Sequence, residues 1–168
     1  MNEKFTVGLI VNNRFGVLNR VAALYSKRGY NIDSLAVGVT EDGRFSRMTI
    51  VSTGDDYMKT QVVRQLRKLH DVRSVCLFDN DKMISVEHML IKLKAGNGKA
   101  AALSGLINDL GGKVRDFGED FIIADITGSC EALDEFVEKV RETGIFELCR
   151  SGLISMAQGA ENTLGIEP

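Results

Sequence analysis

The amino-acid sequence predicts an α+β protein made of two tandem ferredoxin-like βαββαβ domains. Short segments with alternating apolar residues predict strands, whereas other segments place their apolar residues at helical spacing. The same order of elements occurs twice along the 168 residues, although the two halves share no obvious residue identity. A content of 44% hydrophobic residues suits one ordinary domain or two small ones, each with its own core.

The first half of the chain supplies one complete βαββαβ unit. The first helix has one apolar face and ends at Gly29, and Asp55 or Asp56 can cap the second helix. Asp42 and Gly43 form a hairpin signal between the two middle strands. This order of elements is that of a ferredoxin-like domain. The strands are predicted over 4–11, 32–39, 47–52 and 72–78.

The second half repeats this order. Its first helix ends at Gly111 and Gly112, and its second helix ends at Gly144. Its strands are predicted over 88–93, 114–117, 121–126 and 146–156. The polar stretch 79–82 is the natural joint between the halves. We therefore expect an N-terminal domain over 1–79, a C-terminal domain over 83–160 and a loose tail over 161–168.

A single four-stranded sheet with helices on one face leaves its other face and its edges open. Pairing with a second copy is the usual way to cover such surfaces. Leu35, Val37 and Val39 alternate along the second predicted strand, which fits a strand that is paired or covered on both sides. We expect a homodimer or a higher homo-oligomer.

Charge and composition exclude several classes of partner. The formal net charge is −2, and Lys and Arg are spread along the chain instead of forming a basic run. Nucleic acid is therefore not an expected partner. No apolar stretch reaches membrane length or resembles a signal peptide. The three cysteines lack any CxxC pairing and are typical of reduced core thiols, so we expect a soluble cytoplasmic protein without a membrane contact.

Residue types that commonly carry catalysis or bind metals do not form a catalytic or metal-binding pattern in this sequence. His70 and His88 lie far from any pair of cysteines, so a surface or structural role is the better interpretation. Glu119 and Asp120 fall in a predicted hairpin turn, where solvated charge is ordinary. P-loop, GxSxG and HExxH motifs do not occur in the sequence. We expect no catalytic residue and no metal ligand.

The stretch NNRFGVLNRVAALYSKRGYNI, residues 12–32, is a candidate binding segment. A polar turn containing Gly16 opens the first helix. The first N–H groups of a helix have no internal partner and carry the positive end of its dipole, so they can bind a carboxylate. Gly16 lacks a Cβ atom and lets a ligand approach that backbone. Asn13 can either cap the helix or turn toward a ligand, and a plain N-cap beside a turn glycine stays open as the alternative.

Asn31 adds a second polar group to this candidate site. It enters an otherwise apolar predicted strand, where its amide needs a partner. Across a dimer edge, that partner can be a ligand held by the loop of the other subunit. Because an amide both donates and accepts, it suits a zwitterionic amino acid.

Residues 12–51, NNRFGVLNRVAALYSKRGYNIDSLAVGVTEDGRFSRMTIV, closely resemble the N-terminal ACT domain of the small regulatory subunit of acetolactate synthase. VEHMLIKLKA and RSGLISMAQG resemble the C-terminal domain of the same family in order and character. The resemblance implies a non-catalytic subunit that activates a separate catalytic subunit. It also implies feedback by branched-chain amino acids, most often valine.

The resemblance further implies where cofactors and effector bind. Thiamine diphosphate, magnesium and FAD are expected on the catalytic partner, and no cofactor is expected on this chain. In the family the effector lies between two ACT domains, and Gly38 falls at a position linked to effector response. Phe15 stands where the family often has proline. The implied effector residues are the loop Asn13, Arg14, Phe15, Gly16, Val17 and Leu18 of one subunit, with Asn31 and Ile32 of the other.

Two other classes of function stay open at this point. An acyl-phosphate hydrolase on a ferredoxin-like fold needs an anion-binding loop with a catalytic Arg and Asn, and Arg14 can imitate that Arg. An amino-acid-sensing transcription factor needs a helix-turn-helix or a basic ribbon, and the sequence has neither pattern.

Overall fold

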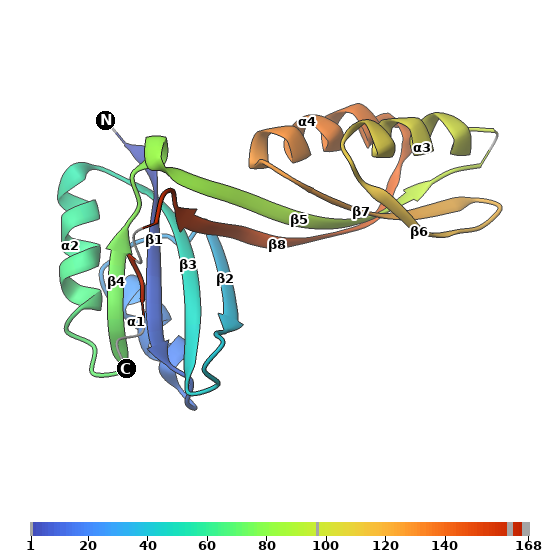
Figure 1. The fold of residues 1–168 in the computed structure, drawn as a ribbon. Coiled ribbons are helices and arrows are strands. Elements are labelled where there is room, and N and C mark those ends of the chain that lie inside the picture. Colours follow the sequence, from blue (N-terminus) through green and yellow to red (C-terminus); the bar gives the residue numbers. More distant parts are fainter. Residues whose placement is uncertain (1, 97, 161–162, 166–168) are drawn as a thin grey trace. The chain divides into compact units, whose positions relative to one another are not determined.

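The structure is a computed structural model that describes residues 2–96, 98–160 and 163–165. The chain divides into two compact units, one built from Met1–Ser85 with Leu153–Pro168 and the other from Val86–Gly152. Each unit contains a four-stranded sheet and two α-helices (Figure 1). The predicted fold class, two βαββαβ repeats, is confirmed.

The N-terminal unit has its strands in the order β2-β3-β1-β4. Its elements are β1 (Glu3–Asn12), α1 (Val17–Lys27), β2 (Ser34–Val39), β3 (Phe45–Gly54), α2 (Asp56–Leu66) and β4 (Val72–Leu77). β2 begins at Ser34, two residues later than predicted, because the chain bends at Asp33, directly before the strand. Asn31 and Ile32 therefore precede the strand.

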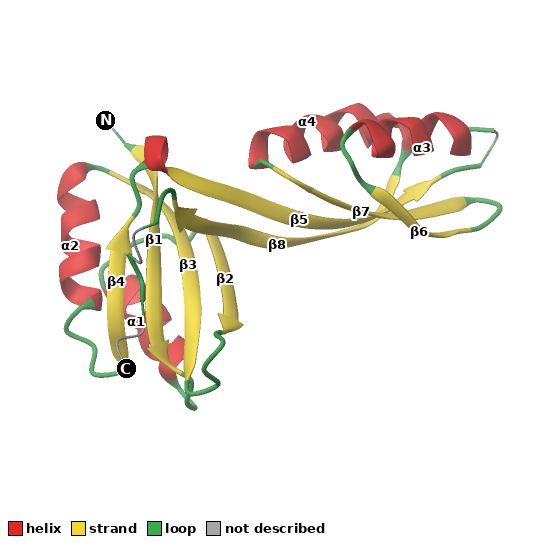
Figure 2. Ribbon diagram, in the orientation of Figure 1, coloured by secondary structure: helices red, strands yellow, loops and turns green. Residues whose placement is uncertain are grey.

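Both helices of the N-terminal unit pack on one face of its sheet (Figure 2). Every second residue of β1 points into this layer, as the alternating pattern predicts. Tyr25 of α1 and Leu66 of α2 are almost fully buried against the strands. The β1 residues of this core are Phe5, Val7, Leu9 and Val11.

The second sheet has the strand order β6-β7-β5-β8. Its elements are β5 (Met83–Lys94), α3 (Ala100–Asp109), β6 (Lys113–Phe117), β7 (Phe121–Gly128), α4 (Cys130–Val140) and β8 (Ile145–Ala157). Met89, Ile91 and Leu93 of β5 are buried beneath the two helices of this unit. Short 3₁₀ turns lie at Asn80–Lys82 and Arg141–Thr143.

A buried ion pair joins three elements of the second unit. Arg150 of β8 pairs with Glu87 of β5 and, at 2.5 Å, with Asp134 of α4. Glu87 is only 5% exposed. The Sγ atom of Cys130 also donates to Glu87 over 3.4 Å. These contacts fix the start of α4 against the two strands.

Described residues of the C-terminal segment, from Leu153 to Leu164, pack on the N-terminal unit. Arg47 donates to the Ser155 carbonyl over 2.7 Å, and the Leu153 amide donates to Ser34 Oγ over 3.0 Å. Leu164, which the sequence analysis assigned to a loose tail, is buried against Ile10 and Phe78. Residues 161–162 and 166–168 of that predicted tail lie outside the described residues. The contacts thus divide the chain differently from the predicted boundaries, which place 83–85 and 153–160 in the C-terminal domain.

Candidate functional site

The candidate loop connects β1 to α1 and turns at Gly16. Gly16 has φ of 82°, a left-handed conformation that residues with a Cβ atom adopt at a cost. It is the N-cap of α1, and no side chain of the described residues caps this helix. The sequence therefore places a glycine where the backbone requires one.

Asn13 does not cap the helix. Its Nδ2 atom donates to the Gly43 carbonyl over 3.0 Å, and its amide donates to the Arg44 carbonyl over 2.7 Å. Both acceptors belong to the turn between β2 and β3. Asn13 thus holds the candidate loop against this turn, and its side-chain oxygen is left to accept from another donor.

The first turn of α1 is arranged to attract negative charge. It contains no acidic residue, and its first amide, that of Val17, reaches only the Arg14 carbonyl over 3.4 Å. The Val17 side chain is buried in the core, so only its N–H group can serve a ligand. An anion beside these N–H groups would be stabilised by the helix dipole.

The other loop side chains lie open to solvent in the single chain. Phe15 is fully exposed, and Leu18 is 44% exposed. Arg14 is also exposed. These side chains therefore do not form a closed apolar wall within one chain.

Asn31 has a partner within its own chain, contrary to the premise of the sequence analysis. Its Nδ2 atom donates to Asp33 over 2.5 Å, and Asp33 accepts from Thr53 over 2.7 Å. Ile32 packs against the N-terminal core. Gly38 lies on the edge strand β2 opposite Arg47, and a Cβ atom added there would meet nothing within 4 Å.

A single chain keeps the two halves of the candidate site apart. The row Val39, Ser46 and Val11 crosses the sheet at the end from which the loop leaves β1. The row Ser34, Val51 and Thr6 crosses the other end, which Asn31 and Ile32 enter. The 11 residues of α1 span about 16 Å between these ends. Gly38, by contrast, lies at the loop end.

A polar network around the buried Asn12 and Asp71 supports the loop, and it was not predicted from the sequence. Asn12 Nδ2 donates to Asp71 Oδ1 over 3.2 Å, and Arg73 Nε donates to Asn12 Oδ1 over 2.9 Å. Arg20 pairs with the other Asp71 oxygen at 3.1 Å. The bond from Asn12 and the nearby Arg20 hold the pKa of Asp71 below its usual value. The sequence signal that could have indicated this network is Asn12, a polar residue at the end of an apolar strand.

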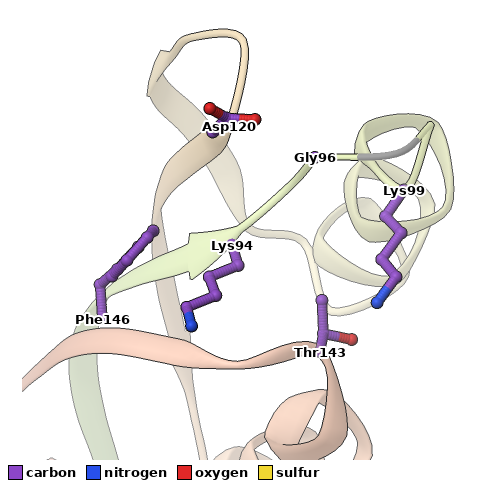
Figure 3. Close-up of a pocket in the computed structure, with 6 residues that line it drawn as sticks. All are labelled: Lys94, Gly96, Lys99, Asp120, Thr143 and Phe146. Atoms are coloured by element: carbon purple, nitrogen blue, oxygen red, sulfur yellow. The ribbon is translucent and has the colours of Figure 1, made fainter.

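The second unit contains a small open pocket of 260 Å³ beside the start of α3 (Figure 3). Lys94 and Lys99 line it, but Asp120 lies apart from both ammonium groups in Figure 3. The charged groups do not converge on one point. The start of α3 beside it, like that of α1, has no side-chain N-cap and no acidic residue in its first turn.

The described residues contain neither a metal-binding cluster nor a membrane-spanning helix. Within them, no group of three or more His, Cys, Asp or Glu residues is placed to hold a metal ion. None of their helices is long and apolar enough to cross a membrane.

Comparisons with known proteins match both units. Residues 7–74 match the family described as "AHAS small subunit-like ACT domain", and residues 86–159 match "Small subunit of acetolactate synthase". A probable acetolactate synthase small subunit from Archaeoglobus fulgidus is 38% identical over 93% of this chain and 98% of its own length. The acetolactate synthase small subunit of Mycobacterium bovis is 36% identical over 92% of each chain.

A solved structure supports the same relationship. The crystal structure of the acetolactate synthase small subunit from Thermotoga maritima matches with a TM-score of 0.88 and 29% identity. The match covers 95% of this chain and 99% of that chain.

Proposed function

This chain belongs to the acetolactate synthase small-subunit family, and from that membership we propose that it activates the catalytic subunit and confers feedback by a branched-chain amino acid, most often valine. The chain itself is non-catalytic and works in the cytoplasm. Thiamine diphosphate, magnesium and FAD belong to the catalytic subunit.

The separation of the two half-sites is the observation that carries the proposal of effector sensing. The loop at Gly16 and the segment at Asn31 lie at opposite ends of one sheet, so one amino acid cannot touch both within a chain. β2 is an edge strand, and its Val37 and Val39 are 46% and 62% exposed. Antiparallel pairing of this edge with a second copy would bring the loop of one subunit to the Asn31 segment of the other.

The chemistry of the two halves fits a zwitterionic amino acid. The N–H groups from Gly16 to Leu18 would hold the carboxylate at the start of α1. The Nδ2 atoms of Asn13 and Asn31 already donate within the chain, so their oxygens would accept from the ammonium group. Ile32 and the exposed Leu18 would contact the aliphatic side chain.

Binding between two chains explains how an effector changes a partner enzyme. A ligand held by both subunits favours the dimer arrangement in which the two halves meet. By linkage, effector binding lowers the affinity for a partner that prefers another arrangement. The factor is the same as that by which the partner lowers the affinity for the effector. The choice among valine, leucine and isoleucine depends on one methylene, which is worth about 1–3 kcal/mol in such pockets.

The test combines this chain with its cognate catalytic subunit and measures acetolactate formation. We expect the chain to raise the rate and L-valine to lower it again, with D-valine as the stereochemical control and L-leucine as a test of side-chain preference. Calorimetry of the chain alone should show saturable binding of L-valine. A catalytic rate that is the same with and without the chain would exclude activation.

The same preparations test the enzyme alternative. Hydrolysis of an acyl phosphate by the isolated chain would favour a hydrolase that uses Arg14. We expect a rate no higher than that of buffer.

A further inference from the structure

Arg20 stands beside the glycine at which the effector carboxylate is proposed to bind. It lies one turn into α1, and its Nη2 atom would be 4.0 Å from a Cβ atom placed on Gly16. Helix side chains lean toward the N-terminus, which brings the guanidinium group back to the loop. The Arg20 side chain is 55% exposed, so a ligand can reach it.

Asp71 holds this guanidinium group in place. It pairs with Arg20 Nη2 at 3.1 Å while its other oxygen accepts from Asn12. The Asp71 carbonyl also accepts from the Asn12 amide over 2.8 Å. Asp71 is therefore attached to the residue directly before the loop, and it is 7% exposed. The ion pair with Asp71 uses one terminal nitrogen, Nη2, of the Arg20 guanidinium group.

The position of Arg20 is unfavourable for the helix alone. Cations destabilise the positive end of the helix dipole, where acidic residues are preferred. α1 has no acidic residue in its first turn, and Arg14 adds a second cation to the loop. Arg73 contacts Asn12 from the other side. Asp71 is the one carboxylate in this network, so the loop keeps an excess of positive charge.

We propose that Arg20 is a further effector-binding residue that pairs with the effector carboxylate, and that Asp71 is a positioning residue that acts through Arg20. This inference rests on the proposed function. Arg20 retains guanidinium donors beyond the one that faces Asp71, and a planar guanidinium matches a carboxylate. The carboxylate would then be held by backbone N–H groups on one side and by Arg20 on the other.

The first experiment is calorimetric titration of the full-length chain with L-valine. Arg20→Gln is expected to weaken binding by about 10- to 100-fold, the size of a hydrogen bond to a charged group. Arg20→Lys should recover part of the loss because it keeps the charge without the fork. Arg28→Gln is the matched control, since Arg28 is an exposed arginine at the other end of the same helix. It should bind like the wild type.

The second experiment separates positioning from general structural support. Asp71→Asn should weaken L-valine binding in the wild type but not in the Arg20→Gln background, because Asp71 acts through Arg20. Thermal unfolding is measured in parallel, and the Arg20 variants should unfold at the wild-type temperature. If Asp71→Asn does not fold, the Arg20 series alone decides.

The outcomes distinguish this inference from the function on which it rests. If the wild type binds L-valine and Arg20→Gln binds it equally well, the role of Arg20 is overturned while the proposed sensor stands. Independent, additive losses in the Asp71 and Arg20 variants would overturn the positioning role of Asp71. If the wild type binds no branched-chain amino acid, alone or with the catalytic subunit, the role of Arg20 and the proposed effector sensing both fall, and activation is judged by the rate assay alone.

Discussion

Leu164 packs against the backbone of Gly8 in the middle of β1. A Cβ atom on Gly8 would lie 2.4 Å from Leu164 Cδ1 and 2.7 Å from the Phe78 ring, both closer than real side chains approach. Glycine at this position therefore lets Leu164 cover the sheet face opposite the helices. Ile10 and Phe78 complete this small cluster.

This contact predicts an overpacking penalty. Gly8→Ala should lower the free energy of unfolding by about 1–3 kcal/mol, because Leu164 and Phe78 must move. Gly38→Ala on β2 is the matched control, since nothing lies within 4 Å of its added Cβ atom. Denaturant unfolding measures both changes. Leu164→Ala in the Gly8→Ala background should recover part of the loss, and purely additive effects would contradict direct packing.

Gly16→Asp should abolish effector binding. The new side chain strains a backbone with φ of 82°, and its negative charge repels the proposed carboxylate. Gly111→Asp is the control, because Gly111 has φ of 68° and open space around it in the second unit. Calorimetry with L-valine should show binding by Gly111→Asp and none by Gly16→Asp. Activation of the catalytic subunit should survive in both, and normal feedback in Gly16→Asp would remove the loop from the site.

Removing the Glu87 charge should destabilise the second unit strongly. Glu87→Gln leaves the half-buried Arg150 with Asp134, which is largely exposed, as its remaining carboxylate partner, and breaking a fully buried ion pair costs about 3–5 kcal/mol, which is the upper bound here. Glu138→Gln breaks the pair with Arg141, in which both side chains are 65% exposed, and should change stability far less because solvent screens exposed charges. Urea unfolding followed by circular dichroism compares the two. Equal losses would show that burial of Glu87 contributes nothing.

Cys130 should be alkylated more slowly than Cys149. Burial and the neighbouring Glu87 raise the pKa of the Cys130 thiol, so less thiolate is present at a given pH. Cys149 is exposed. Iodoacetamide labelling at several pH values, followed by peptide mass spectrometry, gives the order of reaction. Labelling of Cys130 should lag behind that of Cys149 and increase as the pH rises, and Cys149→Ser identifies the exposed site.

The fold was largely predictable because its signals are local. Alternation along β1, the apolar face of α1 and the Asp42-Gly43 turn are set by neighbouring residues. The repeat of βαββαβ units follows from the order of these signals. The start of β2 was less predictable, because Ile32 continues the apolar pattern although the chain bends at Asp33 before the strand begins.

The candidate site was only partly predictable because its contacts are distant in sequence. Asn13 bonds to a residue 30 positions away, and Asn12 bonds to Asp71, which is 59 positions away. Such polar pairs leave no periodic pattern, since each side chain sees only its spatial neighbours. In the sequence, Arg20 looks like any other exposed arginine on a helix, because only the folded chain brings Asp71 beside it.

The two repeats, the first turn of α1 that opens with a glycine, and the family resemblance that points to the loop all follow from the residues in their order along the chain. Tertiary structure alone decided that Leu164 covers Gly8, that Asp71 supports the loop, and that Asn31 lies at the opposite end of the sheet from Gly16. The periodicity of strands and helices depends on residues that are neighbours in the sequence. Strand register and the packing of remote segments depend on the whole chain, because they arise only when it buries its apolar surface and pairs its polar groups.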